Sequence, residues 1–424
     1  MPDISHKKIA STEFYRKRIK QAFVLYGAML FGICFGIGVS IINTRFLTVE
    51  DYGKFKFIQQ LFSLTATLFA FGFSYSAGRL VARAKMVLSC EIIGTTVIIY
   101  LFISLITTWS IFILASDIDK IFESDIANYL RQVSPLIFVS IFAIVIENLL
   151  QGTNKIYNLA FYRVAPGLLY IAGSIVLIIF TTHFNLSTAL LLNLGIAGVV
   201  TILMILTLKP RFAQLKKHLN DIWQENRVNG SHVYVGSLAS VATAQLIGIA
   251  LGYYADMESV GYYSLALVVT TPLQFIPMVI GTTLFKSFVN RPSISSRTIL
   301  ATMLPTAGSL IVFWLIIDRV VILFYSDKYI PVVSFSRILA IGMAFHGLGG
   351  FFNRFLGAHG KGKELRNAAL STGGIILLGC LVLLPCYGAL GAAVVRTFSS
   401  FVFFMVTGLY YRKIVADQSN GKPV

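Results

Sequence analysis

Residues 41–83 read IINTRFLTVEDYGKFKFIQQLFSLTATLFAFGFSYSAGRLVAR, and the rest of the chain is organised around them. It holds the end of one apolar helix, a very short polar turn and a second segment of membrane length that closes on basic residues. The same plan returns about 208 positions later, where Glu50 falls on Glu258 and Gly53 on Gly261 with no gap needed. Few residues are identical, so the match lies in pattern. It predicts a chain built from two halves of one plan.

The composition identifies the class of protein. The chain has 424 residues, of which 56% are hydrophobic and 12% charged, and its mean hydropathy is +0.77. Long apolar segments of this kind have only lipid to hide against, which excludes a soluble domain. The net charge of +17 does not indicate nucleic acid, because the basic residues lie in short runs between apolar segments, where membrane topology accounts for them. We therefore expect no nucleic-acid partner.

Twelve apolar segments are predicted, six on each side of a polar, basic stretch. The first six are 22–47, 52–78, 86–114, 133–152, 157–180 and 188–208, and the second six are 232–254, 262–285, 297–324, 332–356, 365–384 and 389–411. The predicted parts are a basic cytoplasmic N-tail (1–21), an N-terminal six-helix lobe (22–208), a cytoplasmic linker (209–231), a C-terminal six-helix lobe (232–411) and a cytoplasmic C-tail (412–424).

Two of these predicted parts, the N-tail and the linker, each have two possible interpretations. The N-tail is either a surface helix on an anionic leaflet or a topology-setting tail, and the linker is either an amphipathic helix on the membrane surface or a solvated segment.

The basic residues predict the orientation. With both termini in the cytoplasm, the cytoplasmic segments hold about 25 Lys and Arg and the opposite side about 7. Each half crosses the bilayer six times, so the two halves enter in the same direction and are related by an axis along the membrane normal. The predicted fold class is an all-α polytopic membrane protein, with about 12 transmembrane helices in two parallel-repeat six-helix lobes around a central cleft.

Five short sequences carry a family resemblance. TRFLTVEDYGKFKFIQQL and FAFGFSYSAGRLVAR form the opening hairpin, and LLQGTNKIYN, LGAHGKGKELRN and YGALGAAVV form later turns. They resemble the O-antigen and polysaccharide flippases of the multidrug/oligosaccharidyl-lipid/polysaccharide exporter superfamily, over nearly the whole chain.

The resemblance implies a specific role. It implies movement of an undecaprenyl-diphosphate-linked oligosaccharide repeat unit from the cytoplasmic to the periplasmic leaflet of the inner membrane. The polar head would pass through the cleft while the lipid tail stays in the bilayer. Membrane lipid and a polysaccharide polymerase are the other partners it implies.

Two alternatives remain open. One is a cation-coupled multidrug exporter of the same fold. The other is a polyprenyl-dependent membrane glycosyltransferase, which would use the carboxylates of Glu50 and Asp51, although the loop that carries them is too short to build a sugar-binding surface. The sequence has no catalytic motif, no nucleotide fingerprint and no Cys/His cluster of metal spacing, and its histidines are isolated. We therefore expect no enzyme, no metal and no cofactor.

Charged residues within the apolar segments are the candidate site, because an unpaired charge in a bilayer costs at least a few kcal/mol. Arg163, Arg337 and Arg396 are the predicted cleft cations, since guanidinium groups hold a diphosphate well. Glu147 and Glu91 are the candidates for proton or cation coupling.

A structural reading competes with this one. Glu147 and Arg163 lie at equal depth in one hairpin and could pair with each other. Asp318 is the evident partner for Arg337 or Arg396, which leaves at least one arginine free to meet an anion.

Overall fold

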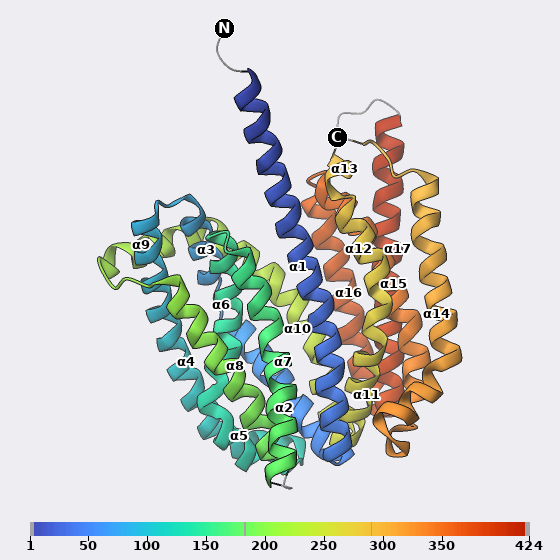
Figure 1. Cartoon of the computed structure of the whole chain (residues 1–424). Helices are drawn as coiled ribbons and strands as arrows, with labels where there is room; N and C mark the ends of the chain where they lie inside the picture. The colour runs from blue at the N-terminus through green and yellow to red at the C-terminus, as the bar shows by residue number, and fades with distance from the viewer. Residues whose placement is uncertain (1–3, 182–183, 290, 420–424) are drawn as a thin grey trace. The chain divides into compact units, whose positions relative to one another are not determined.

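The computed structural model describes residues 4–181, 184–289 and 291–419, and this part of the chain forms helices and turns without a strand (Figure 1). Ten of its helices are long and apolar enough to cross a membrane, and a bent pair, α2 with α3, adds an eleventh. The remaining predicted span coincides with α10, whose apolar part covers Ala244–Tyr254. The chain is a multi-span membrane protein, and its helical fold class agrees with the prediction. The side chains of residues 1–19, which include most of the basic N-tail, lie outside the described part.

The described chain divides into two compact units. Unit 1 contains residues 1–42, 65–116 and 127–235, and unit 2 contains residues 43–64, 117–126 and 236–424. Single helices therefore contribute to both units: α1 and α4 each place one end in unit 2, whereas α2 lies mostly in unit 2 and only its last residues belong to unit 1. Each unit is described below by itself.

The elements of the first half of the chain build unit 1, except that most of α2 and the ends of α1 and α4 belong to unit 2. In order they are α1 (Ile4–Phe46), α2 (Val49–Leu68), α3 (Phe73–Arg83), α4 (Met86–Phe122), α5 (Ala127–Val133), η1 (Ser134–Ile137), α6 (Phe138–Gly152), α7 (Ile156–Thr181), α8 (Leu186–Leu208), α9 (Leu215–Glu225) and η2 (Asn226–Gly230). Helix α6 contacts α3, α7 and α8.

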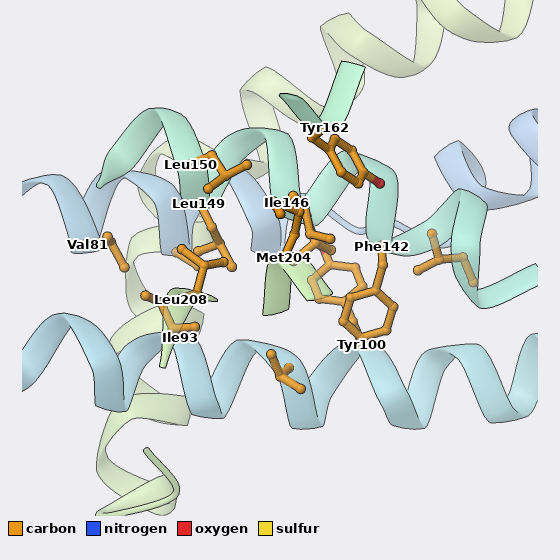
Figure 2. Close-up of a cluster of buried hydrophobic side chains, with 14 of the residues drawn as sticks. Val81, Ile93, Tyr100, Phe142, Ile146, Leu149, Leu150, Tyr162, Met204 and Leu208 are labelled. Atoms are coloured by element: carbon orange, nitrogen blue, oxygen red, sulfur yellow. The ribbon is translucent and has the colours of Figure 1, made fainter. Parts of the chain in front are cut away.

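The core of unit 1 lies where α3, α4, α6, α7 and α8 meet. Figure 2 shows Tyr100 of α4, Phe142 of α6, Tyr162 of α7 and Met204 of α8 converging there. The rings of Tyr100 and Phe142 meet edge to face, with their centroids 6.4 Å apart. Aromatic and branched side chains fill this core densely, so it fixes the helices that carry the charged residues of unit 1.

A break divides the predicted span 52–78. Helices α2 and α3 meet at an angle of 63°, where Phe71 and Gly72 adopt left-handed backbone angles (φ 47° and 80°). The Tyr100 hydroxyl donates to the Ala70 carbonyl at 2.6 Å and accepts from the Ser74 N–H at 2.9 Å, and the Asn226 side chain donates to the Phe71 carbonyl at 3.0 Å. These contacts satisfy the backbone groups that the break frees, which is the condition for irregular backbone at membrane depth.

Unit 2 is organised around α15. Its elements are α10 (Ser231–Tyr254), α11 (Met257–Thr270), η3 (Thr271–Gln274), α12 (Phe275–Thr283), α13 (Phe285–Val289), α14 (Ser296–Tyr325), η4 (Asp327–Tyr329), α15 (Val332–Ala358), α16 (Gly362–Val382) and α17 (Leu384–Ser419), with the first residues of α10 belonging to unit 1. Helix α15 contacts α11, α12, α14, α16 and α17, and Figure 1 shows it beside α17. A left-handed Gly388 (φ 50°) kinks α17 near its start.

The internal repeat has a direct structural counterpart in unit 2. A Cβ on Gly53 of α2 would lie 1.7 Å from the Met257 carbonyl oxygen, and a Cβ on Gly261 of α11 would lie 2.8 Å from the Val49 carbonyl oxygen. Val49 and Met257 are themselves 208 positions apart, as are the two glycines. The contact is therefore reciprocal, as across a two-fold axis.

Loops of unit 2 that are predicted to lie on the same side of the membrane contact one another. At one end, the Lys328 ammonium donates to the Leu47 carbonyl at 2.7 Å, and the ring of Phe122 lies 4.8 Å from Phe57 and 6.2 Å from Tyr253. These contacts bring together four loops predicted on the external side. Loops predicted as cytoplasmic meet elsewhere, as in the hydrogen bond from the Ile294 N–H to the Tyr411 hydroxyl.

Candidate functional site

Arg163 and Glu147 form an ion pair inside unit 1. The Arg163 Nε donates to the Glu147 carboxylate at 2.9 Å, from α7 to α6. The two side chains are 26% and 39% exposed, so neither is sealed in the core. Of the two readings left open by the sequence, this geometry fits mutual pairing. It also leaves both groups accessible to a competing partner.

Arg337 and Asp318 form the corresponding pair in unit 2. The Arg337 guanidinium donates to the Asp318 carboxylate at 2.7 Å, from α15 to α14, and both side chains are about half exposed. The indole of Trp314 donates to the Arg337 backbone carbonyl at 3.1 Å, which ties the two helices together beside the pair. Asp318 is thus used by Arg337.

Arg396 has no carboxylate partner among the described residues. It lies in the apolar part of α17, about 12 Å along the helix from the kink at Gly388. Its guanidinium forms no hydrogen bond or ion pair with the described side chains, and its side chain is partly buried. Of the three predicted cleft arginines, Arg396 is thus the one without a carboxylate partner in the described chain, and its role in a cleft stays a prediction.

Two polar side chains of other helices lie near Arg396. It lies close enough to Tyr263 of α11 and His346 of α15 to act electrostatically on both. The His346 ring stacks on Phe403 at 5.2 Å, and its buried Nδ1 has no hydrogen-bond partner in the described chain. Local sequence pattern could not group Arg396, Tyr263 and His346, because they come from three helices.

Lys56 is a further cation that the sequence analysis did not single out. It lies seven residues into α2, about 10 Å along the helix from its start. Its ammonium lies 5.6 Å from the ring of Tyr52 and 5.7 Å from that of Phe55, and no described carboxylate pairs with it. A lysine inside an apolar segment was the signal that could have revealed it.

Glu91 lies within hydrogen-bond distance of a histidine. Its carboxylate lies 2.9 Å from Nε2 of His218, whose Nδ1 lies 3.4 Å from Asp221. His218 belongs to α9 and is fully buried, which corrects the expectation that each histidine stands alone.

Within the described residues no group of three or more His, Cys, Asp or Glu side chains could hold a metal ion.

Comparisons with known proteins give a family and a fold. A family model described as polysaccharide biosynthesis protein matches residues 19–291. No curated protein sequence matches the chain.

Solved structures show the same architecture. The lipid II flippase MurJ in an inward closed conformation is 15% identical, with 93% of this chain and 89% of that chain covered and a TM-score of 0.74. An inward-facing multidrug resistance MATE family transporter of the MOP superfamily is 14% identical, with 92% and 96% covered and a TM-score of 0.71. A MOP superfamily transporter from Pyrococcus furiosus is 15% identical, with 94% and 96% covered and a TM-score of 0.56. The chain therefore has the fold of these transporters.

Proposed function

The chain belongs to the polysaccharide biosynthesis protein family, and we propose from this premise that it is a flippase for lipid-linked oligosaccharides. Its cargo is an undecaprenyl-diphosphate-linked repeat unit of O-antigen or a related surface polysaccharide. The protein moves this cargo from the cytoplasmic to the periplasmic leaflet of the inner membrane by alternating access of its two lobes, with both termini in the cytoplasm. A polysaccharide polymerase takes up the product.

One observation carries the proposal. Arg396 is a guanidinium in an apolar span, and no described carboxylate compensates its charge. Such a charge is costly in a bilayer unless an anion or water meets it during function. A diphosphate presents several oxygens that the planar guanidinium fork can bind in pairs. The diphosphate of the cargo is the anion that we assign to Arg396.

The paired arginines give the cargo further sites. Arg163 and Arg337 hold partly exposed carboxylates in the structure, and in the proposed cycle the diphosphate replaces each carboxylate in turn. A released Glu147 then takes a proton or a cation, which couples transport to an ion gradient. Glu91 has the same capacity once α9 and His218 move away from it, and Lys56 offers an additional ammonium to the glycan head.

A gene deletion tests this function. Cells without the protein should accumulate undecaprenyl-linked single repeat units and lose the surface polymer, and the wild-type gene should restore both. Normal surface glycan together with altered drug sensitivity would identify the alternative, a cation-coupled multidrug exporter of the same fold. The carboxylate–arginine pairs are the feature that this alternative would use. Transferred sugar in place of transported lipid would identify the glycosyltransferase.

A further inference from the structure

A large apolar groove lies in unit 1, between α4 and α9. Its volume is about 1390 Å³. Ile98, Phe102 and Ile106 line it from α4, and Leu219 and Trp223 line it from α9. Phe102 is 65% exposed and Leu219 50% exposed, so the groove is open and its walls have no protein covering in the described chain.

Helix α9 is held firmly over this groove. The buried His218 reaches Glu91 of α4 at 2.9 Å, and Glu225 pairs with Arg79 of α3 at 3.0 Å. The chain just before α9 is also fixed, because the Arg211 N–H donates to the Cys90 carbonyl at 2.9 Å. Three attachments to two helices make the groove a built feature of unit 1.

Two lysines without carboxylate partners lie at this groove. Lys216 and Lys217 both line it and both are exposed. The acids of α9 are used elsewhere, Asp221 by His218 and Glu225 by Arg79. Among the described residues, the one hydrogen bond of either ammonium is that from Lys217 to the Gln214 side chain at 3.4 Å. An apolar groove with two uncompensated cations is complementary to an amphiphile with an anionic head.

We propose that this groove binds an anionic glycerophospholipid of the surrounding bilayer. One acyl chain lies along α4 from Ile98 to Ile106, and the phosphate lies at Lys216 and Lys217. The α4 wall is about 12 Å long, which fits the chains of one leaflet, about half of a 30 Å hydrocarbon core, and is far too short for a polyprenyl tail. None of Arg163, Arg337 and Arg396 lines the groove, so the site is separate from the proposed cargo path.

Tryptophan quenching tests this assignment. The chain has three tryptophans, and the changes Trp109→Phe and Trp314→Phe leave Trp223 as the only one, inside the groove. The protein is reconstituted in phosphatidylcholine vesicles that contain a small fraction of phosphatidylglycerol with brominated chains. Quenching should be half-maximal at a mole fraction on the order of tenfold lower than with brominated phosphatidylcholine, because each lysine near a surface attracts an anionic head.

The variant Lys216→Gln/Lys217→Gln should lose this preference, whereas Lys361→Gln/Lys363→Gln, which removes two lysines outside the groove, should keep it. Native mass spectrometry of the same two lysine variants, made in the chain that keeps all three tryptophans, should show the same difference in the amount of phosphatidylglycerol that stays bound. Equal quenching by both brominated lipids, or an unchanged preference without the two lysines, would overturn the proposal. Displacement of the brominated lipid by a trace of polyprenyl phosphate would also overturn it and would make the groove a site for the cargo tail.

Discussion

The charged residues inside the spans divide into paired and unpaired groups. Arg163 and Arg337 each meet a carboxylate on a neighbouring helix, whereas Arg396 meets none in the described chain. An isolated charge in a bilayer is costly in free energy. An arginine paired with a carboxylate avoids this cost and can serve helix packing alone. A guanidinium without a carboxylate needs a partner from outside the chain. Arg396 is therefore the residue on which the account depends most.

Replacing Arg396 by Ala should reduce glycan export at least about tenfold, the effect of losing a charge-assisted hydrogen bond pair to the diphosphate. Arg396→Lys should restore export only partly, since an ammonium keeps the charge but loses the fork. Export is measured as surface polysaccharide, and protein levels by immunoblot of membranes. Arg319→Ala, an exposed position on α14, is the matched control. Normal export by Arg396→Ala would remove the arginine from the mechanism.

The Arg163–Glu147 pair calls for a double-mutant cycle. If the pair serves only packing, Arg163→Ala should lower membrane levels of the protein, and the double change Glu147→Ala/Arg163→Ala should restore both levels and export. If the pair acts in transport, each variant should reach normal levels and the double variant should still fail to export. We expect the second outcome. Recovery of export in the double variant would leave the pair with a packing role only.

The sequence predicted part of this site. The equal depth of Glu147 and Arg163 in one hairpin predicted that they could meet, and Asp318 was the evident partner near Arg337 and Arg396. Contacts between distant segments could not be predicted from the sequence. His218 and Glu91 lie 127 positions apart. His346 lies near Arg396 only because α15 packs on α17. Such contacts depend on tertiary packing, which the local pattern of the sequence does not predict.

At the scale of the elements, hydropathy located the helices better than their breaks. The run 52–78 reads as one span because its apolar residues continue through Phe71 and Phe73, yet the helix breaks at the left-handed Gly72. Hydrogen bonds from Tyr100 and Asn226, far away in the chain, stabilise this break. Apolar composition reports burial in lipid, whereas a break depends on such distant polar partners.

The contact of α2 with α11 predicts a sensitive glycine. Gly53→Ala would place a methyl group against the Met257 carbonyl, 1.7 Å away before relaxation, and overpacking of this kind costs on the order of 1–3 kcal/mol. The melting temperature of the detergent-purified protein should fall. Gly350→Ala is the control, because its added methyl group has no neighbour within 4 Å and alanine favours the helix. An unchanged melting temperature for Gly53→Ala would show that this contact does not form.

At the scale of the whole molecule, the repeat of about 208 positions predicts the topology. The reciprocal contact of Gly53 and Gly261 supports two halves of one plan, and the contacts between loops of unit 2 agree with it. The side of the membrane on which each set lies rests on the distribution of basic residues.

Cysteine labelling checks the orientation. In a background without Cys34, Cys90, Cys380 and Cys386, cysteines at Lys120 and Glu258 should react with an impermeant thiol reagent added from outside. Cysteines at Lys363 and Lys413 should react only after permeabilisation. All four positions are exposed. External reaction at Lys363 would contradict the parallel arrangement of the two halves.

Transport by the purified protein in liposomes tests whether Arg396 carries the diphosphate of a lipid-linked oligosaccharide across the membrane. Purified protein is placed in liposomes that carry a labelled undecaprenyl-diphosphate oligosaccharide in both leaflets, and a glycan-cleaving enzyme is added outside. With wild-type protein, cleavage should proceed from about half of the lipid to nearly all of it, whereas Arg396→Ala should stop where protein-free liposomes stop. The wild-type protein is tested in its folded form, with an ion gradient imposed in either direction. If cleavage still halts at about half of the lipid, the proposed transport is wrong.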